Sequence, residues 1–355
     1  VNPAREAFYG WLIGNKVEEG KLPLLVQAFE AFKRGVGVGE VPAVDFRLLS
    51  GLPLKREHWM VITERMGWTA TRMNLNTLAR HGVFRPATRA EAMAEVTGRS
   101  GMTLTERVAA RLRNPELIEK ARAFPYQILI AHRMASDAVP VEIKEALQDA
   151  LEIAVDRTPA IEGKVVVLPD VSGSMGSPVT GFRQGATTAV SCREVAALVT
   201  AAVLRRNPRA LVLPFDNRLW RSGVNGRDSL ATNTARLAAL GGGGTDCSLP
   251  LRFMNQHKAE VDLVLMISDN QSWIDNRRQG ATEVMAQWEA LKQRNPQARL
   301  ACLDLQPYDV TVASERDDIL NIGGISDAVF EVIAKFARYE LDPGHWVKEV
   351  EGIEL

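Results

Sequence analysis

Oxygen-bearing side chains follow an apolar run near the middle of the chain. The run Val165 to Leu168 predicts a buried strand, and Asp170, Ser172 and Ser174 come after it at alternate positions. Two glycines in the same stretch allow the loop to turn tightly. A carboxylate and two hydroxyl groups on one short loop at the carboxyl end of a strand are suited to hold a hard divalent cation.

Two later loops carry further oxygen ligands. The glycine run at 241–244 is followed by Thr245, and the apolar run Leu265 to Ser268 ends in Asp269. Short Asp/Ser loops are common, however, and the same residue types also cap helices and turns. The residues alone therefore leave two interpretations open, namely a cation site built by three loops and ordinary capping.

The elements that must position these loops alternate between strand and helix. Apolar runs predict strands at Val165 to Leu168, Ala210 to Phe215, Val261 to Ser268 and Ala298 to Leu305. Amphipathic patterns predict helices at Ala186 to Arg206, Ser229 to Leu240, Leu249 to His257, Thr282 to Arg294 and Ile325 to Tyr339. This alternation predicts a doubly wound, mostly parallel α/β domain at 161–340, with its ligand site at the carboxyl ends of the strands.

The first part of the chain has a helical pattern throughout. Helices are expected at Ala4 to Ile13, Leu22 to Lys33, Phe46 to Leu49, Lys55 to Met66, Thr69 to His81, Leu104 to Leu112, Pro115 to Arg122, Pro125 to Met134 and Val141 to Ala154. Short helices joined by short polar, Gly or Pro breaks predict an array of HEAT-like helical repeats. We therefore expect a multidomain α and α/β protein, with a helical repeat domain at 1–160 and a C-terminal tail at 341–355.

Charge is balanced overall but uneven along the chain. The 43 Lys+Arg and 43 Asp+Glu residues give a formal net charge of zero. From Arg47 to Arg133, however, there are 15 basic and 7 acidic residues. Such a local basic excess favours a polyanionic partner, although solvated helix surfaces also collect basic residues.

Composition places the protein among ordinary globular, cytoplasmic proteins. Hydrophobic residues make up 46% of the chain and charged residues 24%. The three cysteines are far apart and lack the spacing of a zinc or disulfide framework, which fits a reducing compartment. No run of 18 apolar residues is present, so no membrane partner is expected.

The sequence lacks the enzyme motifs considered next, so no catalytic residues are expected. The sequence Ser172-Gly-Ser-Met-Gly176 differs from the G-x-S-x-G nucleophile motif. The glycine run at 241–244 lacks the lysine of a phosphate-binding loop. The five histidines form no metal-binding pair along the sequence. The protein is therefore expected to bind ligands, not to catalyse a reaction.

The three oxygen-bearing loops together resemble the metal-ion-dependent adhesion site of von Willebrand factor A (vWA) domains. That pattern is D-x-S-x-S, a Thr on a later loop and an Asp after a later strand, and it is filled by Asp170, Ser172, Ser174, Thr245 and Asp269. The resemblance implies a divalent cation, Mg²⁺ first and Mn²⁺ or Ca²⁺ as alternatives. It also implies that an open coordination position accepts an acidic side chain of a protein partner.

The helical part resembles the TROVE module of the Ro autoantigen family. The matching stretches are Glu57-His-Trp59, Glu64-Arg-Met66, Thr69-Ala70, Asn74-Leu75 and Ala121 to Ala131, and the glycine loop Gly243 to Pro250 matches as well. The family implies a ring of helical repeats followed by a vWA domain. It also implies binding of small noncoding Y-type RNA and of misfolded RNA 3′ ends, cooperation with an exoribonuclease, and a role in RNA quality control or decay.

Candidate RNA contacts are the basic residues around the signature helices, namely Arg47, Lys55, Arg56, Arg65, Arg72, Arg80 and Arg85. Arginine predominates over lysine here, which suits bidentate contact with phosphate. The chain departs from the family at its start, where the N-terminal part of the helical ring has no counterpart. A metal-dependent protein–protein adaptor without RNA binding is the alternative function.

Overall fold

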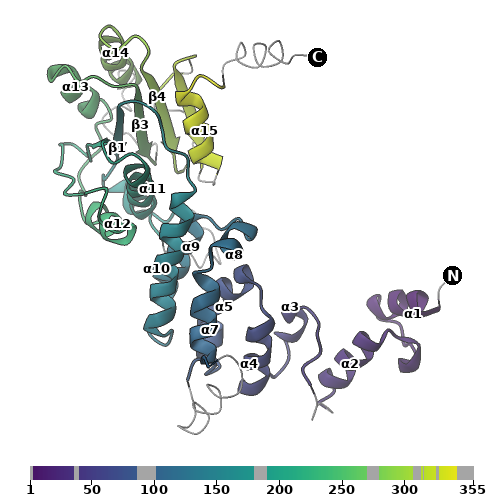
Figure 1. The fold of residues 1–355 in the computed structure, drawn as a ribbon. Helices are drawn as coiled ribbons and strands as arrows, with labels where there is room; N and C mark the ends of the chain where they lie inside the picture. The colour runs from purple at the N-terminus through teal and green to yellow at the C-terminus, as the bar shows by residue number, and fades with distance from the viewer. Residues whose placement is uncertain are drawn as a thin grey trace, which may run out of the picture. The chain divides into compact units, whose positions relative to one another are not determined.

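The computed structural model describes residues 3–35, 40–85, 101–179, 190–269, 280–306, 313–314, 316–324 and 328–341 (Figure 1). The chain divides into two compact units. The first comprises Val1–Leu117 and Ala135–Ala146, and the second comprises Ile118–Met134 and Leu147–Leu355. None of the helices in these described ranges is long and apolar enough to cross a membrane.

The first unit is helical, as the sequence pattern predicts. Its helices are α1 (Pro3–Leu12), α2 (Leu24–Lys33), α3 (Phe46–Leu49), α4 (Arg56–Arg65), α5 (Trp68–Arg80) and α7 (Leu104–Leu112), and a short 3₁₀ turn, η1 (Glu19–Lys21), joins the first two. The helices α8 (Pro115–Lys120) and α10 (Val141–Asp156) pass from the first unit into the second. Most observed helix ends lie within one or two residues of those expected.

Helices α4, α5 and α7 pack around a shared core. Leu78, Val108 and Leu112 are completely buried there. The Nε1 group of Trp68 donates a hydrogen bond of 2.9 Å to the backbone oxygen of Leu112, which joins the start of α5 to the end of α7. Gly67 is extended and separates α4 from α5, so the two helices are distinct elements. These contacts fix the position of the helices that carry most of the candidate RNA residues.

The second unit contains a five-stranded parallel sheet. Its strands are β1 (Val165–Pro169), β2 (Leu211–Val212), β3 (Leu263–Ser268), β4 (Arg299–Asp304) and β5 (Ile319–Gly323), in the order β2-β1-β3-β4-β5. Every pairing is parallel. The sequence analysis predicted four strands and missed β5, and it extended β2 by several residues. β5 has Asn321 at its centre and ends in Gly323, so it lacks the continuous apolar run that marks β1 and β3 as strands.

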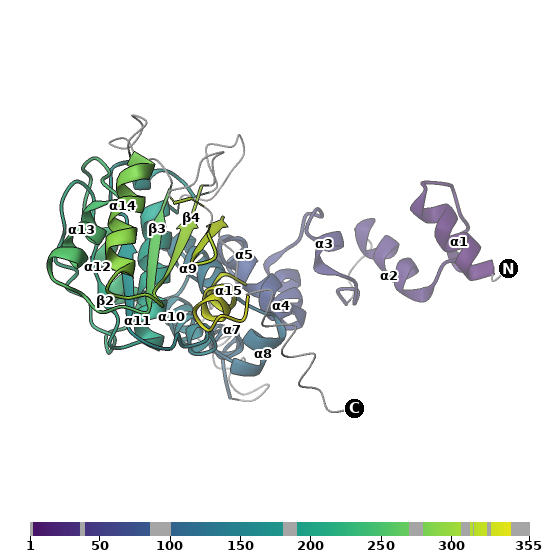
Figure 2. The same cartoon turned by 90° about the horizontal axis from the view of Figure 1, so that it is seen from above.

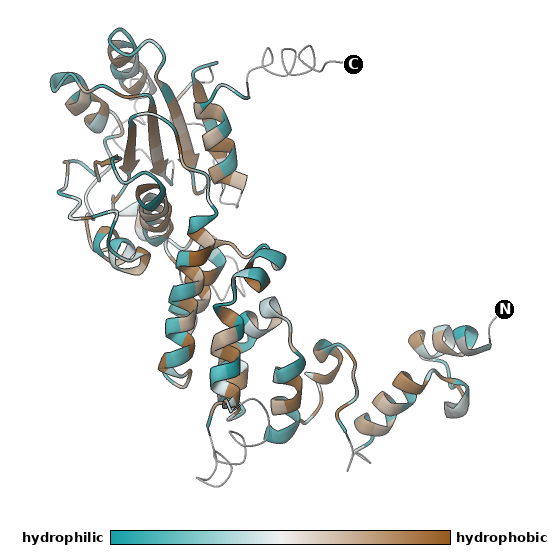
Figure 3. Cartoon of the chain, in the orientation of Figure 1, coloured by the Kyte–Doolittle hydropathy of each residue, from teal (hydrophilic) through white to brown (hydrophobic). Residues whose placement is uncertain are grey.

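Helices cover both faces of this sheet (Figures 1 and 2). They are α11 (Cys192–Arg206), α12 (Leu230–Ala238), α13 (Leu249–Gln256), α14 (Gly280–Lys292) and α15 (Ala328–Ala337), and α9 (Pro125–Met134) packs against α11. Alternate residues of β1, β3 and β4 face opposite layers, because side chains of a strand point to its two faces in turn. β1, β3 and β4 are buried along their whole length and mostly apolar, as expected for a sheet covered on both sides (Figure 3).

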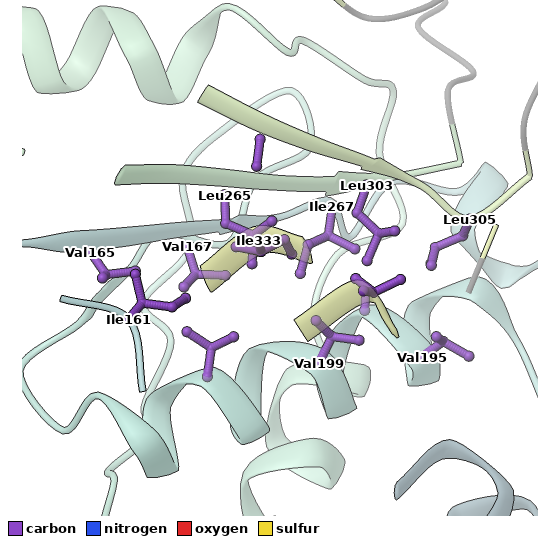
Figure 4. Packing of buried hydrophobic residues seen from close by; sticks show 14 of the residues in the cluster. Ile161, Val165, Val167, Val195, Val199, Leu265, Ile267, Leu303, Leu305 and Ile333 are labelled. Carbon is purple, nitrogen blue, oxygen red and sulfur yellow. The ribbon is translucent and has the colours of Figure 1, made fainter. Parts of the chain in front are cut away.

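One face of the sheet packs against α11 and α15. Val167, Leu265 and Leu303 of the strands meet Val199 of α11 and Ile333 of α15 in one cluster (Figure 4). The other face packs against α13 and α14, where the largest fully buried side chain is that of Trp288. Because both faces are covered, the carboxyl edge of the sheet, from which the loops after β1 and β3 leave, is where its ligand site is expected.

Candidate functional site

The loop after β1 begins with a buried carboxylate. Asp170 is fully buried and pairs with the end of the neighbouring strand through its backbone N–H, which donates to the oxygen of Ile267 at 2.9 Å. Its Oδ1 accepts a hydrogen bond of 2.7 Å from the backbone N–H of Ser172, and its Oδ2 accepts one of 2.8 Å from the hydroxyl of Ser268. The carboxylate is therefore held in one orientation by two different strand ends.

Three of the expected ligands form a chain of close oxygen contacts. The hydroxyl oxygens of Ser172 and Ser174 lie 3.2 Å apart, and the Ser174 hydroxyl donates to Oδ1 of Asp269 at 3.2 Å. Neighbouring oxygens around an octahedral Mg²⁺ are about 3 Å apart, given Mg–O distances of about 2.1 Å. The spacing of these oxygens therefore fits one small cation bound by all three residues.

The glycine loop is bonded directly to the loop after β1. The backbone N–H of Gly173 donates to the oxygen of Gly243 at 2.8 Å, and that of Gly242 donates to the oxygen of Val171 at 2.9 Å. Gly241 has φ of +86°, and a Cβ atom there would lie 1.8 Å from the Val171 oxygen. Only glycine allows this close approach.

Thr245 follows the glycine loop and is fully buried. In the part of the chain that the structure describes, its hydroxyl oxygen is shielded from solvent and has no hydrogen-bond partner. A buried hydroxyl without a partner is unfavourable by about 1–3 kcal/mol. A cation coordinated by this oxygen would remove that cost, so Thr245 fits the ligand role that the family pattern implies.

The acidic groups of the site are buried close to one another. Burial raises the pKa of Asp170 to about 6, with a further contribution from the nearby Asp269 carboxylate, while the hydrogen bonds from Ser172 and Ser268 act in the opposite direction. Burial and the Asp269 charge also raise the pKa of Asp304, at the end of β4, to about 6. A divalent cation would stabilise the ionised forms of this group of carboxylates.

Three residues that support the site were not identified from the sequence. Ser268 holds Asp170, Arg193 donates from Nη2 to the backbone oxygen of Ser172 at 2.8 Å, and Asp216 accepts from the backbone N–H of Gly243 at 3.1 Å. The bond from Gly243 to Asp216 holds the glycine loop in place. The only sequence signal for Ser268 is its position directly before Asp269.

The described residues contain no group of three or more His, Cys, Asp and Glu side chains arranged to hold a metal ion. The candidate centre differs from such a group because three of its five expected ligands are hydroxyl groups. Hydroxyl oxygens are neutral, so a cation bound there keeps much of its positive charge. The arrangement can therefore anchor a cation and, through it, an anionic group of a partner.

Four of the seven candidate RNA residues are engaged in contacts within the first unit, namely Arg47, Arg56, Arg65 and Arg72. Arg56 donates to the backbone oxygens of Gly82 and Arg85, at 2.9 and 2.6 Å. Arg65 donates to the backbone oxygen of Val41 at 2.8 Å. The guanidinium of Arg72 lies over the ring of Trp68, 5.8 Å from its centre. Arg56 and Arg72 are only partly exposed, so both have a structural role.

Five of the candidate residues are exposed, namely Arg47, Lys55, Arg65, Arg80 and Arg85. Arg47 forms a two-point ion pair with Asp45, with N–O distances of 2.9 and 2.8 Å. Lys55 precedes α4, and Arg80 lies in the last turn of α5. Among the seven, these five are the residues whose charges are most accessible to a polyanion.

Comparison with known proteins matches both parts of the chain. Residues 164–337 match the family model of the Ro60 vWA domain. The chain is 26% identical over 286 residues to the RNA-binding protein RO60 of Deinococcus radiodurans, covering 78% of this chain and 50% of the relative. It is 23% identical over 261 residues to the RNA-binding protein RO60 of Caenorhabditis elegans, covering 69% of this chain and 38% of that relative. The chain thus spans half or less of the length of these two relatives.

A solved structure shares the fold. The crystal structure of the Deinococcus radiodurans RO (RSR) protein matches with a TM-score of 0.64 and 21% sequence identity, over 96% of this chain and 64% of the other. The match extends over both units, so the combination of helical part and parallel sheet is that of the solved protein.

Proposed function

Since this chain is a Ro-type protein that carries a Ro60 vWA domain at residues 164–337, we propose that it is an RNA-binding protein. The relatives in Deinococcus radiodurans and Caenorhabditis elegans are both named RNA-binding proteins. The basic excess between Arg47 and Arg133 supports the same function, because phosphate contacts supply most of the affinity for nucleic acid.

The proposed ligands are small noncoding Y-type RNA and the 3′ ends of misfolded RNA, in RNA quality control or decay. An exoribonuclease is the proposed protein partner in that role, and the cytoplasm is the proposed compartment. These details rest on the family resemblance. The exposed arginines of the first unit support RNA binding in general, since an exposed guanidinium can contact phosphate in a bidentate manner.

RNA binding is tested with the full chain and a labelled small structured RNA at several salt concentrations. Affinity should fall steeply as salt rises, because each phosphate contact releases counterions. The double variant Arg47→Ala, Arg80→Ala should bind more weakly and show a shallower salt dependence. Arg209→Ala, an exposed position in the second unit, serves as the matched control. Absence of RNA binding by the unmodified chain at low salt would reject the proposal.

We further propose that Asp170, Ser172, Ser174, Thr245 and Asp269 hold a divalent cation, most simply Mg²⁺. The close oxygen contacts among Ser172, Ser174 and Asp269 and the buried, unpartnered hydroxyl of Thr245 support this assignment. When bound, the cation would supply a positive anchor for an acidic side chain of a protein partner. The protein's own side chains orient the ligands and hold the three loops together.

A thermal unfolding experiment with added MgCl₂ or MnCl₂ tests the cation site. Either salt should raise the melting temperature of the unmodified chain, because a ligand that binds only the folded state stabilises it. Ser174→Ala should lose most of that rise. Ser177→Ala is the matched control, because its half-buried side chain is three residues further along and has no hydrogen bond in the described structure. An equal rise in Ser174→Ala would contradict the assignment.

A metal-dependent adaptor without RNA binding is the second candidate function, and the geometry of the oxygen cluster is the observation that favours it. It predicts protein capture that EDTA abolishes, together with no affinity for RNA in the titration above. The two candidates are therefore separated by the same pair of measurements.

A further inference from the structure

A cavity in the first unit lies outside the candidate cation site. Its volume is about 470 Å³. It is open to solvent on one side and lined by residues from the segment 41–49, from helices α4 and α5 and from the link between these helices. Most of its wall is apolar, including Phe46, Ile62, Met66 and Met73. Pockets of a few hundred Å³ with apolar walls and a few polar groups are typical of binding sites for small ring systems.

The walls of this cavity are held in place by the protein itself. Arg65 of α4 donates to the backbone oxygen of Val41 at 2.8 Å, which ties the segment 41–49 to the helix. Asp45 caps α3 by accepting from the backbone N–H of Arg47 at 2.9 Å. Leu49, at the end of α3, is 1% exposed and anchors the segment in the core. The cavity is therefore formed before any ligand arrives.

One apolar residue of the cavity wall, Met73, is largely exposed to solvent. The side chain of Met73 is 70% exposed although it lines the cavity. An exposed methionine on an apolar wall offers a soft, polarisable surface that packs against flat rings. Phe46, on the segment 41–49, is half-buried and adds an aromatic ring to the same cavity.

Asn74 supplies a polar group on the same wall. Its Nδ2 donates to the backbone oxygen of Ala70 at 2.8 Å, which leaves Oδ1 as an acceptor. Within the described ranges no group donates to this oxygen. A partly buried amide oxygen on a cavity wall can accept a hydrogen bond from an N–H group of a ligand.

Charge at the cavity favours an anion near its opening. Arg47 and Arg65 both line it, and Asp45, the only carboxylate among the described wall residues, is paired with Arg47, so Arg65 supplies the net positive charge. Both arginines have exposed side chains. A ligand that combines a flat ring, an N–H donor and a nearby negative charge would satisfy the wall, Asn74 and the arginines at once.

We propose that this cavity takes one unpaired base of a bound RNA, with the adjoining phosphate beside Arg47 and Arg65. Single-stranded RNA is commonly recognised through bases that leave the stack and enter pockets of this kind. An apolar protein side chain would fill the walls but would leave the Asn74 oxygen without a donor. The assignment rests on the proposed RNA binding and names a site for it.

The test compares two probes on the full chain. One is single-stranded oligouridylate of about 12 nucleotides, and the other is an abasic chain of equal length, which keeps the sugar and phosphate groups. Ala70→Leu fills the cavity from its α5 wall. Ala110→Leu makes the same change at an exposed position on α7 and is the matched control. Met73→Ser removes the exposed apolar wall at a position where folding is little affected.

The unmodified chain and Ala110→Leu should bind the oligouridylate at least about ten-fold more tightly than the abasic chain. Ala70→Leu and Met73→Ser should lose most of that ratio while keeping their affinity for the abasic chain. A ratio unchanged in both variants would overturn the proposal and leave the cavity to a protein side chain. Equal binding of both probes by the unmodified chain overturns the base site but not RNA binding, whereas binding of neither overturns both.

Discussion

The guanidinium of Arg193, at the start of α11, bonds to the loop after β1 that carries candidate cation ligands. Its Nη2 atom lies 2.8 Å from the backbone oxygen of Ser172 and donates a hydrogen bond to it. Arg193 is the second residue of α11, whose first turn begins with a capping box in which Ser191 and Glu194 bond each other's backbone N–H groups. The helix start is therefore fixed, and through Arg193 it fixes the loop that carries three of the five expected ligands, Asp170, Ser172 and Ser174.

Replacing Arg193 by Met should weaken both the fold and the cation site. A hydrogen bond to a charged group contributes roughly 1.5–3 kcal/mol, and a decrease of that size in the free energy of unfolding is expected. Urea unfolding measures it, and Mn²⁺ titration followed by electron paramagnetic resonance should show weaker cation binding. Arg209→Met, an exposed site shortly after the same helix, should change neither quantity. Unaltered Mn²⁺ affinity in a folded Arg193→Met chain would show that the contact does not position the loop.

Replacement by alanine should destabilise the protein strongly at one glycine of the glycine loop and only slightly at another. At Gly241 the added Cβ meets a backbone oxygen at 1.8 Å, and φ is +86°. At Gly244 nothing lies within 4 Å, and φ is not in the left-handed region. Gly241→Ala should therefore lower the free energy of unfolding by at least about 2 kcal/mol, whereas Gly244→Ala should stay within about 1 kcal/mol of the unmodified chain. Equal unfolding free energies of the two variants in denaturant would contradict the close approach of Gly241 to the Val171 backbone oxygen.

The positions of the site residues in the chain could be predicted because they follow strands. Asp170 and Asp269 come directly after apolar runs, and the carboxyl ends of parallel strands meet at one edge. The contact from Arg193 to Ser172 could not be predicted in the same way. It depends on the residue at which α11 starts and on the direction of a long side chain, and neither leaves a periodic pattern in the sequence.

For the candidate RNA residues, the sequence could not indicate which side chains are engaged within the protein. Sequence indicates that arginines collect between Arg47 and Arg85, but it does not indicate which of them bond to the protein itself. Arg56 and Arg65 bond to backbone oxygens 24 to 29 residues away, which only the packing of the helices brings near. The strand β5 was missed for a similar reason, since parallel pairing with β4, and not its own composition, makes it a strand.

Asp304 should make the stability of the protein depend on pH. Its pKa is raised to about 6 by burial and by the Asp269 carboxylate, whereas the ordinary value is 3.8. The folded state therefore holds a proton that the unfolded state releases between these values, so stability falls as pH rises from about 4 to about 6. Above that range the ionised Asp304 lowers stability by up to about 3 kcal/mol.

Asp304→Asn should remove the Asp304 contribution to this dependence, because the amide does not ionise, and should leave the similar contribution of Asp170, whose pKa is also about 6. In the presence of EDTA, the variant should exceed the unmodified chain in unfolding free energy at about pH 7.5 and match it more closely at about pH 4. Asp317→Asn, at an exposed position shortly before β5, is the control and should follow the unmodified chain throughout. A constant difference between Asp304→Asn and the unmodified chain at all pH values would contradict the raised pKa.

Thr245→Val should have effects of opposite sign on the metal-free and metal-loaded protein. The Thr245 hydroxyl is buried without a partner in the described structure, so replacing it by a methyl group of similar shape should raise the metal-free unfolding free energy by about 1 kcal/mol. The same change removes a proposed ligand, so the stabilisation by Mg²⁺ should largely disappear. Thr234→Val is the matched control, because the Thr234 hydroxyl in α12 is also buried without a partner.

Thr234→Val should gain about as much stability as Thr245→Val without metal but should keep the full response to Mg²⁺. Thermal unfolding of the three proteins in EDTA and in excess MgCl₂ separates the two effects. If Thr245→Val keeps the Mg²⁺ response, its oxygen is not a ligand, and the cation would have to be held by the loops after β1 and β3 alone.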